Sequence, residues 1–261
     1  MRYSKRIFIG SSLLLFLIFV ALYGHFFSPY TYDETHLSEK NMAPTWDHIM
    51  GTDDVGRDVF TRVCVGLSLS LSIGLLAAVL DVIIGVTWGA ISGYFGGKVD
   101  RIMMQTADII YSLPYLLFVI LIAALNGPGI TSILAAMVLI GWIQMARLTR
   151  AQVLAAKELE YVAAARALGL HPRTIVWRHI MPNISGPLLA MMMLTIPHAI
   201  FAEAFLSFLG IGIQPPLASL GSMISDSLAA MRYYPWRLFF PAGTITLVIL
   251  SCNLISEGLR D

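Results

Sequence analysis

Two acidic residues, Asp81 and Glu203, lie inside long apolar stretches of this 261-residue chain and are the first candidates for a chemical role. An unpaired charge at the centre of a membrane helix costs at least about 2.5 kcal/mol, so such residues often mark a solute pathway. Both residues are candidates for lining a pathway, and Glu203 is the better candidate because it lies near the outer end of its apolar stretch. The alternative is that each carboxyl group is hydrogen-bonded inside a helix bundle or lies near a span end.

A second group of candidates lies in the polar stretch Glu158–Pro182, between two apolar stretches. Its ionisable side chains are Glu158, Glu160, Arg166, His171, Arg173, Arg178 and His179. A short polar segment with both signs of charge, held between hydrophobic spans, is suited to contact a partner protein. The alternative is an ordinary solvated loop with some helical turns.

The same stretch carries signals for two short amphipathic helices. Residues at i, i+1, i+4 and i+7 spacing predict one apolar helical face: Tyr161, Val162, Ala165 and Leu168. Gly169 suits the end of this helix because glycine takes a positive φ readily. Pro172 suits the start of a second helix, because the first turn needs no N–H partner. The second helix has a narrow apolar face of Ile175, Val176 and Ile180, and Pro182 is expected to end the unit.

No motif for catalysis or for phosphate binding is present in the 261 residues. Gly96-Gly97-Lys98 lacks the G-x-x-x-x-G-K-[ST] spacing of a phosphate loop, and no H-E-x-x-H, G-x-S-x-G or C-x-x-C occurs. His198 near three methionines suggests metal handling only weakly, because no other strong ligand lies four residues away and methionine is a common packing residue. We therefore expect no metal site, no bound cofactor and no enzymatic activity in this chain, and no basic run predicts nucleic-acid binding.

The composition points to a membrane protein with several spans. Hydrophobic residues make up 57% of the chain and charged residues 13%, against about 25% charged in soluble domains. Six apolar runs are long enough, or nearly so, to span a bilayer. They cover about 7–27, 67–94, 102–125 (with Pro114 as an expected kink), 130–146, 185–208 and 238–255. The predicted fold is therefore all-α, with six transmembrane helices. The first run could instead be a signal peptide, but it is too long and lacks a cleavage site.

Basic residues are distributed unequally between the two sides that six spans define. Of the 17 lysines and arginines, 12 lie on the side of the N-terminus and 5 on the other side. Cytoplasmic segments carry the excess of positive charge. We therefore expect both termini and the Glu158–Pro182 stretch in the cytoplasm, with the acidic segment 28–66 and the loop 209–237 outside.

Three blocks of this sequence together resemble the permease subunits of bacterial ABC importers, in the dipeptide, oligopeptide and nickel branch. The chain resembles the second of the two paired permeases in that branch. Residues 48–62 are similar to the block "LGTD-x-x-GRD-x-x-SR", residues 160–182 to the "EAA" loop, and residues 202–216 to "AE-x-x-LSFLG-x-G-x-x-PP". The glutamate of the "EAA" motif would fall at Ala163, so its salt bridge is absent or is made by Glu160 one turn earlier.

The resemblance implies a type I importer permease with a domain organisation in three parts. An N-terminal transmembrane helix covers 1–27, an extracytoplasmic segment covers 28–66, and a five-helix core covers 67–261. Within the core, residues 155–182 correspond to the cytoplasmic loop that couples to the ATPase subunits, which we call the coupling loop. The expected coupling residues are Glu160, Ala164, Ala165, Arg166, Gly169, Arg173, Arg178, His179 and Pro182.

The resemblance also implies the partners and the solute. A second permease would form a heterodimer with this chain, one or two separate ATPase subunits would bind ATP and Mg²⁺, and a binding protein would deliver the solute from outside. The expected location is the bacterial inner membrane, and the expected solutes are di- and oligopeptides, whose amino terminus could meet Glu203. Alternatives are import of nickel or a metal chelate and, more distantly, a stand-alone secondary transporter. A secondary transporter would be expected to show internal repeats, and none is convincing here.

Overall fold

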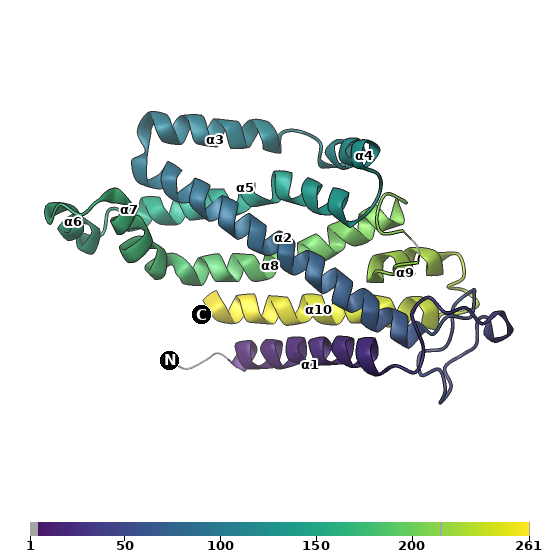
Figure 1. Ribbon diagram of the computed structural model, residues 1–261. Helices are drawn as coiled ribbons and strands as arrows, with labels where there is room; N and C mark the ends of the chain where they lie inside the picture. The colour runs from purple at the N-terminus through teal and green to yellow at the C-terminus, as the bar shows by residue number, and fades with distance from the viewer. Residues whose placement is uncertain (1–4, 215, 261) are drawn as a thin grey trace.

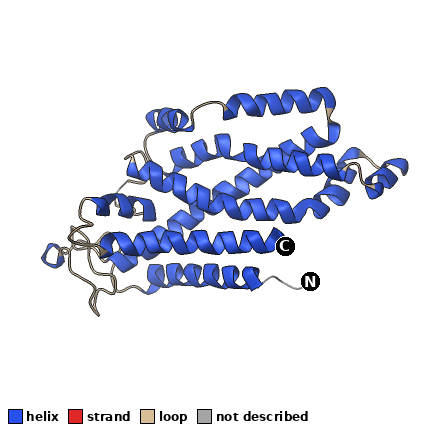
Figure 2. Cartoon of the chain, turned by 180° about the vertical axis from the view of Figure 1, so that it is seen from behind, coloured by secondary structure: helices blue, strands red, loops and turns tan. Residues whose placement is uncertain are grey.

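The computed structural model describes residues 5–214 and 216–260, and every regular element in this part of the chain is helical (Figures 1 and 2). The elements are α1 (Lys5–Phe27), η1 (Leu37–Glu39), α2 (Val59–Phe95), α3 (Gly97–Tyr111), α4 (Tyr115–Asn126), α5 (Ile130–Ala156), α6 (Glu160–Ala167), α7 (Pro172–Thr174), η2 (Ile175–Ile180), α8 (Met181–Phe208), α9 (Leu220–Leu228) and α10 (Trp236–Arg260). The predicted all-α class is confirmed.

Five helical segments are long and apolar enough to cross a membrane, and α3 with α4 supplies a sixth if this bent pair is one span. The six predicted runs agree with these segments, but three of the helices extend well beyond the apolar runs. Helix α2 begins at Val59, α5 continues to Ala156, and the segment that contains α8 begins at Pro172. Each extension contains at least one arginine, such as Arg62, Arg150 and Arg178, and these charges placed the predicted ends of the apolar runs inside the helices.

Pro114 breaks its span instead of only kinking it. Helix α3 ends at Tyr111, Pro114 precedes the first residue of α4, and the two helix axes differ by 76°. Proline lacks an N–H donor and disfavours helical geometry in the residue before it, which explains the break. Figure 1 shows α3 side-on along the top of the bundle and α4 turned nearly end-on beside it.

Helices α2 and α5 pack against each other at the centre of the bundle. The contact is close because three glycines, at successive turns of α2, face α5. A methyl group on Gly85 would lie 2.6 Å from the main-chain oxygen of Trp142, and one on Gly93 would lie 2.9 Å from that of Arg150. Gly89, between them, meets Ala146 and Thr149 in the same way. Small residues at every fourth position let membrane helices approach closely.

Both described ends of the chain lie at the same end of the bundle. Figure 1 shows α1 running beside α10, with the start of α1, the end of α10 and the α6–α7 region together at the left. An ion pair of 3.5 Å between Arg6 and Glu257 joins α1 to α10 at this end. The segment before α2 and the helix α9 lie at the opposite end, so the topology has an even number of crossings.

Buried charges hold that opposite end together. Asp58 caps α2 by accepting hydrogen bonds of 2.8 Å from the main-chain nitrogen and from the hydroxyl of Thr61, and it bonds to His48 over 2.9 Å. Asp58 therefore acts as the N-cap of α2, with its negative charge at the positive end of the helix dipole. Arg237, at the start of α10, donates to Asn41 and to Asp54 over 3.0 and 3.1 Å. We call these residues, together with Asp53, Arg57 and Arg62, the outer anchor.

Candidate functional site

The coupling loop folds as a short helix, α6, packed against the start of the α7–α8 segment. Val162 and Ala165 are the buried residues of α6, and they pack with Ile175, Val176 and Ile180 in one apolar cluster. The cluster also contains residues of α2 and α5. The predicted apolar faces of both helices are therefore confirmed at these positions, and the back of α6 is joined to three transmembrane helices.

Leu168 is a correction to the predicted face of α6. It is 80% exposed and follows the end of the helix, whereas the expectation placed it with the buried residues. Leu168 is the C-cap residue of α6, and its side chain lies outside the apolar cluster. An apolar side chain is therefore left on the surface beside Ala163, Ala164 and Ala167, which are also exposed.

Gly169 ends α6 with the geometry that was predicted for it. Its φ is +72°, its N–H donates to the oxygen of Arg166 over 2.9 Å, and the N–H of Leu170 donates to Ala165 over 3.2 Å. This pair of hydrogen bonds defines a Schellman motif, which turns the chain sharply after a helix. A Cβ atom on Gly169 would have no neighbour within 4 Å, so only the positive φ requires glycine here.

Pro182 does not end the unit as expected. Residues 172–208 form one continuous helical segment of 37 residues, with Pro182 inside it and a π-helical turn, η2, just before it. The side-chain nitrogen of Asn183 donates to the oxygen of His179 over 2.7 Å and satisfies this carbonyl group near the proline. An extra residue in a π-helical turn is one way in which a helix accommodates such a local irregularity. The second half of the coupling loop is thus the first part of a transmembrane helix.

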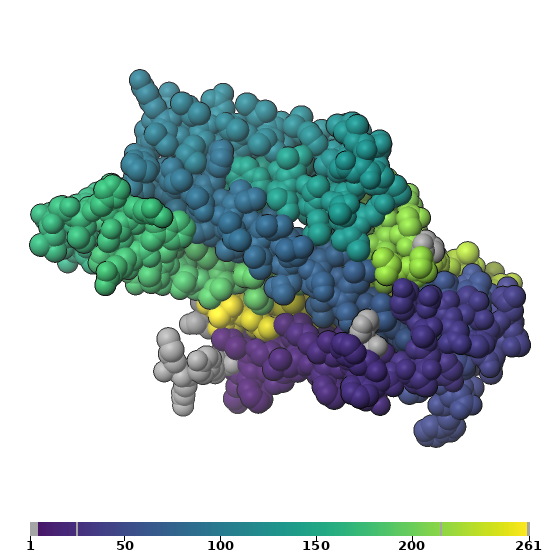
Figure 3. Space-filling view, in the orientation of Figure 1, coloured from purple at the N-terminus to yellow at the C-terminus, as the bar shows by residue number. Residues whose placement is uncertain are grey.

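Most of the predicted coupling residues lie on the surface of the protein. Those that are exposed are Glu160, Ala164, Arg166, Gly169, Arg173, Arg178 and Pro182, whereas His179 is half-buried and Ala165 is buried. Figure 3 shows α6 and α7 projecting from one end of the molecule. Glu160 makes no ion pair with any residue that the structure describes, so the proposed replacement for the motif glutamate does not form within this chain.

Sequence reasoning missed two contacts at this end of the bundle, one between the coupling loop and α2 and one between α5 and α3. The guanidinium group of Arg166 lies over the ring of Tyr94 at the end of α2, 5.5 Å from its centre. Arg150 on α5 forms a bidentate pair with Asp100 on α3, at 2.5 and 2.6 Å. The two partners are 72 residues apart in the first pair and 50 residues apart in the second. No local sequence pattern could have identified them.

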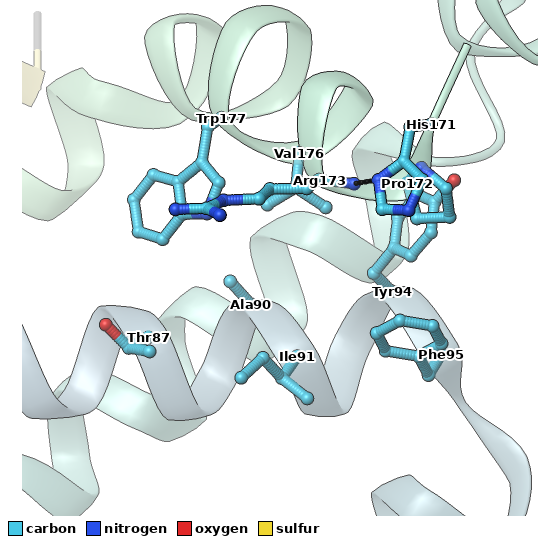
Figure 4. Close-up of a pocket in the computed structure, with 10 residues that line it drawn as sticks. All are labelled: Thr87, Ala90, Ile91, Tyr94, Phe95, His171, Pro172, Arg173, Val176 and Trp177. Carbon is cyan, nitrogen blue, oxygen red and sulfur yellow. Dashed lines mark hydrogen bonds between the residues drawn. The ribbon is translucent and has the colours of Figure 1, made fainter.

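A groove of about 380 Å³ separates the end of α2 from the α7–η2 segment (Figure 4). One wall carries Ile91 and Phe95, and the other carries Val176, Trp177 and Arg173. In Figure 4 the Arg173 side chain extends along the Trp177 ring, and the main-chain N–H of Arg173 donates to the His171 ring over 3.3 Å. The groove therefore lies between the end of α2 and the second half of the coupling loop, and exposed residues of that loop form one of its walls.

Glu203 is enclosed in the interior of the bundle. It has no exposed surface, and its two carboxyl oxygens accept hydrogen bonds from Ser70 of α2, at 3.2 Å, and Ser207 of α8, at 2.8 Å. The sequence left two alternatives for Glu203, contact with a pathway or hydrogen bonding inside the bundle. The structure shows the hydrogen bonding. The role of Glu203 in a pathway stays a prediction, and this conformation gives it no contact with the surface.

Asp81 lies in a different environment, at a small cavity between α2, α4, α5 and α8. The cavity has a volume of about 160 Å³, and its polar lining comes from Asp81, Tyr115, Thr195 and His198. Asp81 is 5% exposed, and its Oδ1 atom has no hydrogen-bond partner among the described residues. The described residues contain no group of three or more histidines, cysteines or carboxylates that could hold a metal ion.

Comparisons with known proteins agree with the geometry of this bundle and its loop. Residues 85–261 match the family described as "Binding-protein-dependent transport system inner membrane component", and residues 2–44 match the "N-terminal TM domain of oligopeptide transport permease C". The chain is 48% identical to the "Oligopeptide transport system permease protein OppC" of Bacillus subtilis (strain 168), over 100% of this chain and 85% of that protein. It is 46% identical to the "Dipeptide transport system permease protein DppC" of the same organism, over 99% and 81%.

A solved structure shares the fold at much lower sequence identity. The chain of the "MetNI methionine ABC transporter" in an inward-facing conformation superposes with a TM-score of 0.60 at 16% identity, and covers 76% of this chain and 96% of that one. This likeness supports the fold and says nothing about the solute. The match over residues 85–261, together with relatives that cover the whole chain, shows that this protein belongs to the family of binding-protein-dependent transport system inner membrane components, the permease subunits of ABC importers.

Proposed function

We propose that this chain pairs with a second permease subunit to form the transmembrane pathway of an ATP-driven importer of di- and oligopeptides. The solute is inferred from relatives named as oligopeptide and dipeptide permeases, which align over nearly the whole chain. The paired permease is inferred from the family resemblance of the three sequence blocks. The chain's own contribution is structural and mechanical, since its sequence contains no motif for ATP hydrolysis.

The observation that carries this proposal is the construction of the coupling loop. Its exposed side presents small and apolar residues (Ala163, Ala164 and Leu168), and its buried side belongs to an apolar cluster shared with α2 and α5. A partner that moves α6 therefore also moves the α7–α8 segment, which is continuous into the membrane. Such a surface is suited to receive force from separate ATPase subunits, which would bind ATP and Mg²⁺.

The orientation of the chain follows from charge and topology together. Both termini and the coupling loop lie at one end of the bundle, and 12 of the 17 lysines and arginines belong to that side. Cytoplasmic segments of membrane proteins carry the excess of basic residues. We therefore place this end in the cytoplasm and the outer anchor outside, where a solute-binding protein would dock. The location is the bacterial inner membrane.

A reconstituted complex tests this function directly. The chain is purified with the permease, ATPase and binding-protein chains encoded beside it, and the complex is placed in proteoliposomes that contain ATP. Uptake of labelled di- and tripeptides is expected, and uptake should stop when the ATPase subunits carry a substitution that prevents hydrolysis. A second preparation lacks residues 160–171 of this chain, and it should lose the ATPase subunits while it keeps the paired permease.

Two results would contradict the proposal. ATP-independent uptake driven by an ion gradient would favour a secondary transporter. Uptake of nickel or a nickel chelate, with no peptide uptake under the same conditions, would favour the metal branch of the family.

A further inference from the structure

The cavity at Asp81 is formed by four helices that meet near the middle of the bundle. Asp81 comes from α2, Tyr115 from the start of α4, Gly141 from α5, and Thr195 and His198 from α8. The remaining lining is apolar, and no lysine or arginine is among the described residues that line it. The cavity therefore offers oxygen and imidazole groups but no basic side chain.

Two polar atoms at this cavity lack partners. Asp81 Oδ1 and the hydroxyl oxygen of Tyr115 are both buried without a hydrogen bond among the described residues. Buried polar atoms are almost always hydrogen-bonded, so each exception needs an explanation such as a ligand. An ionised carboxylate only accepts hydrogen bonds, and a hydroxyl group both accepts and donates them, so one donor group in the cavity would satisfy both atoms.

Close packing holds the Asp81 carboxyl group against α5. A methyl group on Gly141 would lie 2.5 Å from Asp81 Oδ2 and 2.7 Å from Oδ1, so glycine is required for the carboxyl group to occupy this position. The carboxyl group is therefore fixed in direction by helix packing, and not by hydrogen bonds to the chain. A preorganised acceptor of this kind binds a cation without first giving up internal bonds.

The cavity also reaches the surface of this chain. His198 is exposed and Thr195 is half-buried, whereas Asp81 lies behind them. On α5, Gln144 is exposed one turn beyond Gly141 and donates to Tyr111 over 3.0 Å. Polar residues on an exposed face inside a membrane bundle usually face a pathway or a partner helix and not lipid.

We propose that this cavity binds the primary ammonium group of the transported solute, with Asp81 as its counter-ion and Tyr115 as a second acceptor. The inference rests on the proposed peptide transport, because a free peptide carries such a group at its amino terminus. An ammonium group has three donors and no acceptor, which matches a cavity with acceptors and no basic residue. A volume of about 160 Å³ fits the amino-terminal end of a peptide rather than a whole oligopeptide.

Glu203 does not fit this role in the same bundle. Its oxygens already accept hydrogen bonds from Ser70 and Ser207, and it has no exposed surface. The amino-terminal contact that the sequence suggested for Glu203 is thus assigned here to Asp81, which has a free acceptor and a cavity.

Chemical labelling of the unmodified complex tests the site without any substitution. Dicyclohexylcarbodiimide reacts with carboxyl groups in apolar surroundings, and mass spectrometry identifies the labelled residue. In nanodiscs that hold the full complex without ATP or binding protein, we expect Asp81 to be labelled. Tri-alanine at ten times its dissociation constant should lower the labelling rate about tenfold, whereas N-acetyl tri-alanine should leave it unchanged. Equal protection by both peptides, or by neither, would overturn the proposal.

Substitutions provide an independent measurement by peptide uptake in proteoliposomes. Asp81→Asn should lower tri-alanine uptake about thirtyfold, since it removes one partner of a buried charge pair. Gly141→Ala keeps the carboxyl group but displaces it, and should also lower uptake. The matched control Asp47→Asn removes the same charge from an exposed loop residue and should leave uptake unchanged.

The outcomes separate this inference from the proposed function. If the unmodified complex imports no peptide, peptide transport itself fails. If it imports tri-alanine and both Asp81→Asn and Gly141→Ala import it equally well, peptide transport stands and the ammonium site is wrong. If Asp81→Asn does not assemble, Gly141→Ala and the labelling of the unmodified complex still decide the question.

Discussion

The outer anchor and the coupling loop lie at opposite ends of the same helices, and different forces hold each of them. In the outer anchor, the side chains of Asp58 and His48 are 3% and 4% exposed and bond directly to each other. In the coupling loop, Gly169 and its Schellman hydrogen bonds determine the turn, and the exposed residues are mostly small or apolar. One end is held by polar side chains that bond to one another, whereas the other is held by its backbone turn, an apolar cluster and the contact of Arg166 with Tyr94.

This difference indicates which end carries stability and which end carries coupling. Removing one member of a buried, mutually bonded set leaves its partners unsatisfied, and this is costly to the fold. Substituting an exposed residue of the coupling loop removes few contacts within the chain, so its effect should appear in complexes with other chains. The predictions below test this division, beginning with the largest expected effect.

Asp58→Ala should destabilise the protein by about 3 kcal/mol, because it removes the cap of α2 and leaves Thr61 and His48 without their shared acceptor. Thermal unfolding in detergent, followed by tryptophan fluorescence, measures the change. The exposed Asp47→Ala serves as the control and should change stability by less than about 0.5 kcal/mol. Equal stability of Asp58→Ala and the parent would remove the distinction between the two ends.

Gly169→Val should cost about 1–2 kcal/mol locally, because valine is strained at a φ of +72°. The strain should distort the turn after α6 and uncouple ATP hydrolysis from uptake, whereas insertion in the membrane continues. The measurement is peptide imported per ATP hydrolysed in proteoliposomes. Gly169→Asn is the matched control, since asparagine adopts this conformation more readily and the position has open space around it. Normal coupling in the valine variant would show that the turn geometry is unimportant.

Leu168→Ser should change the free energy of unfolding by less than about 0.5 kcal/mol, because the side chain is 80% exposed. It should nevertheless weaken association with the ATPase subunits, since it removes the largest apolar side chain next to the exposed alanines of α6. Co-purification of the subunits with the tagged chain, compared across salt concentrations, measures the association. If stability falls and association does not, Leu168 packs within this chain and the docking surface lies elsewhere.

The smallest expected effect is a pH dependence of stability that comes from Asp226 of α9. Asp226 keeps an exposed side chain, so the surrounding chain desolvates it only in part; this raises its pKa, while nearby Arg62 acts in the opposite direction. A carboxyl group whose pKa is raised on folding contributes most to stability at low pH, and this contribution is lost as the pH rises through the folded pKa. Asp226→Asn should therefore gain stability relative to the parent as the pH is raised from about 4 to 8. A difference that does not change with pH would exclude this electrostatic origin.

Local sequence signals were sufficient where the physical cause is itself local. Gly169 and Pro172 act through the φ angle and a missing N–H group, and each was predicted at the right position. The apolar runs likewise predicted the transmembrane helices, because burial in lipid depends on the hydrophobicity of about 20 successive residues.

The predictions that were wrong concerned the positions at which helices end. Pro182 was expected to end a helix, but the π-helical turn before it allows the helix to continue into the membrane. Leu168 was expected to be buried, but the helix ended before its side chain could reach the apolar cluster. The first outcome follows from the π-helical turn before Pro182, and the second from the turn at Gly169, which ends α6 just before Leu168 could join a longer helix.

Sequence alone determined the all-α class, the span order, the position of the coupling loop and the presence of two acidic residues in apolar surroundings. Only the tertiary structure distinguished those two acids. Glu203 meets serines of α2 and α8, one of them 133 residues away in the chain, whereas Asp81 meets a glycine of α5 and an open cavity. A hydropathy pattern records the cost of placing a charge in the membrane, but the groups that offset this cost come from other helices and are set by helix packing.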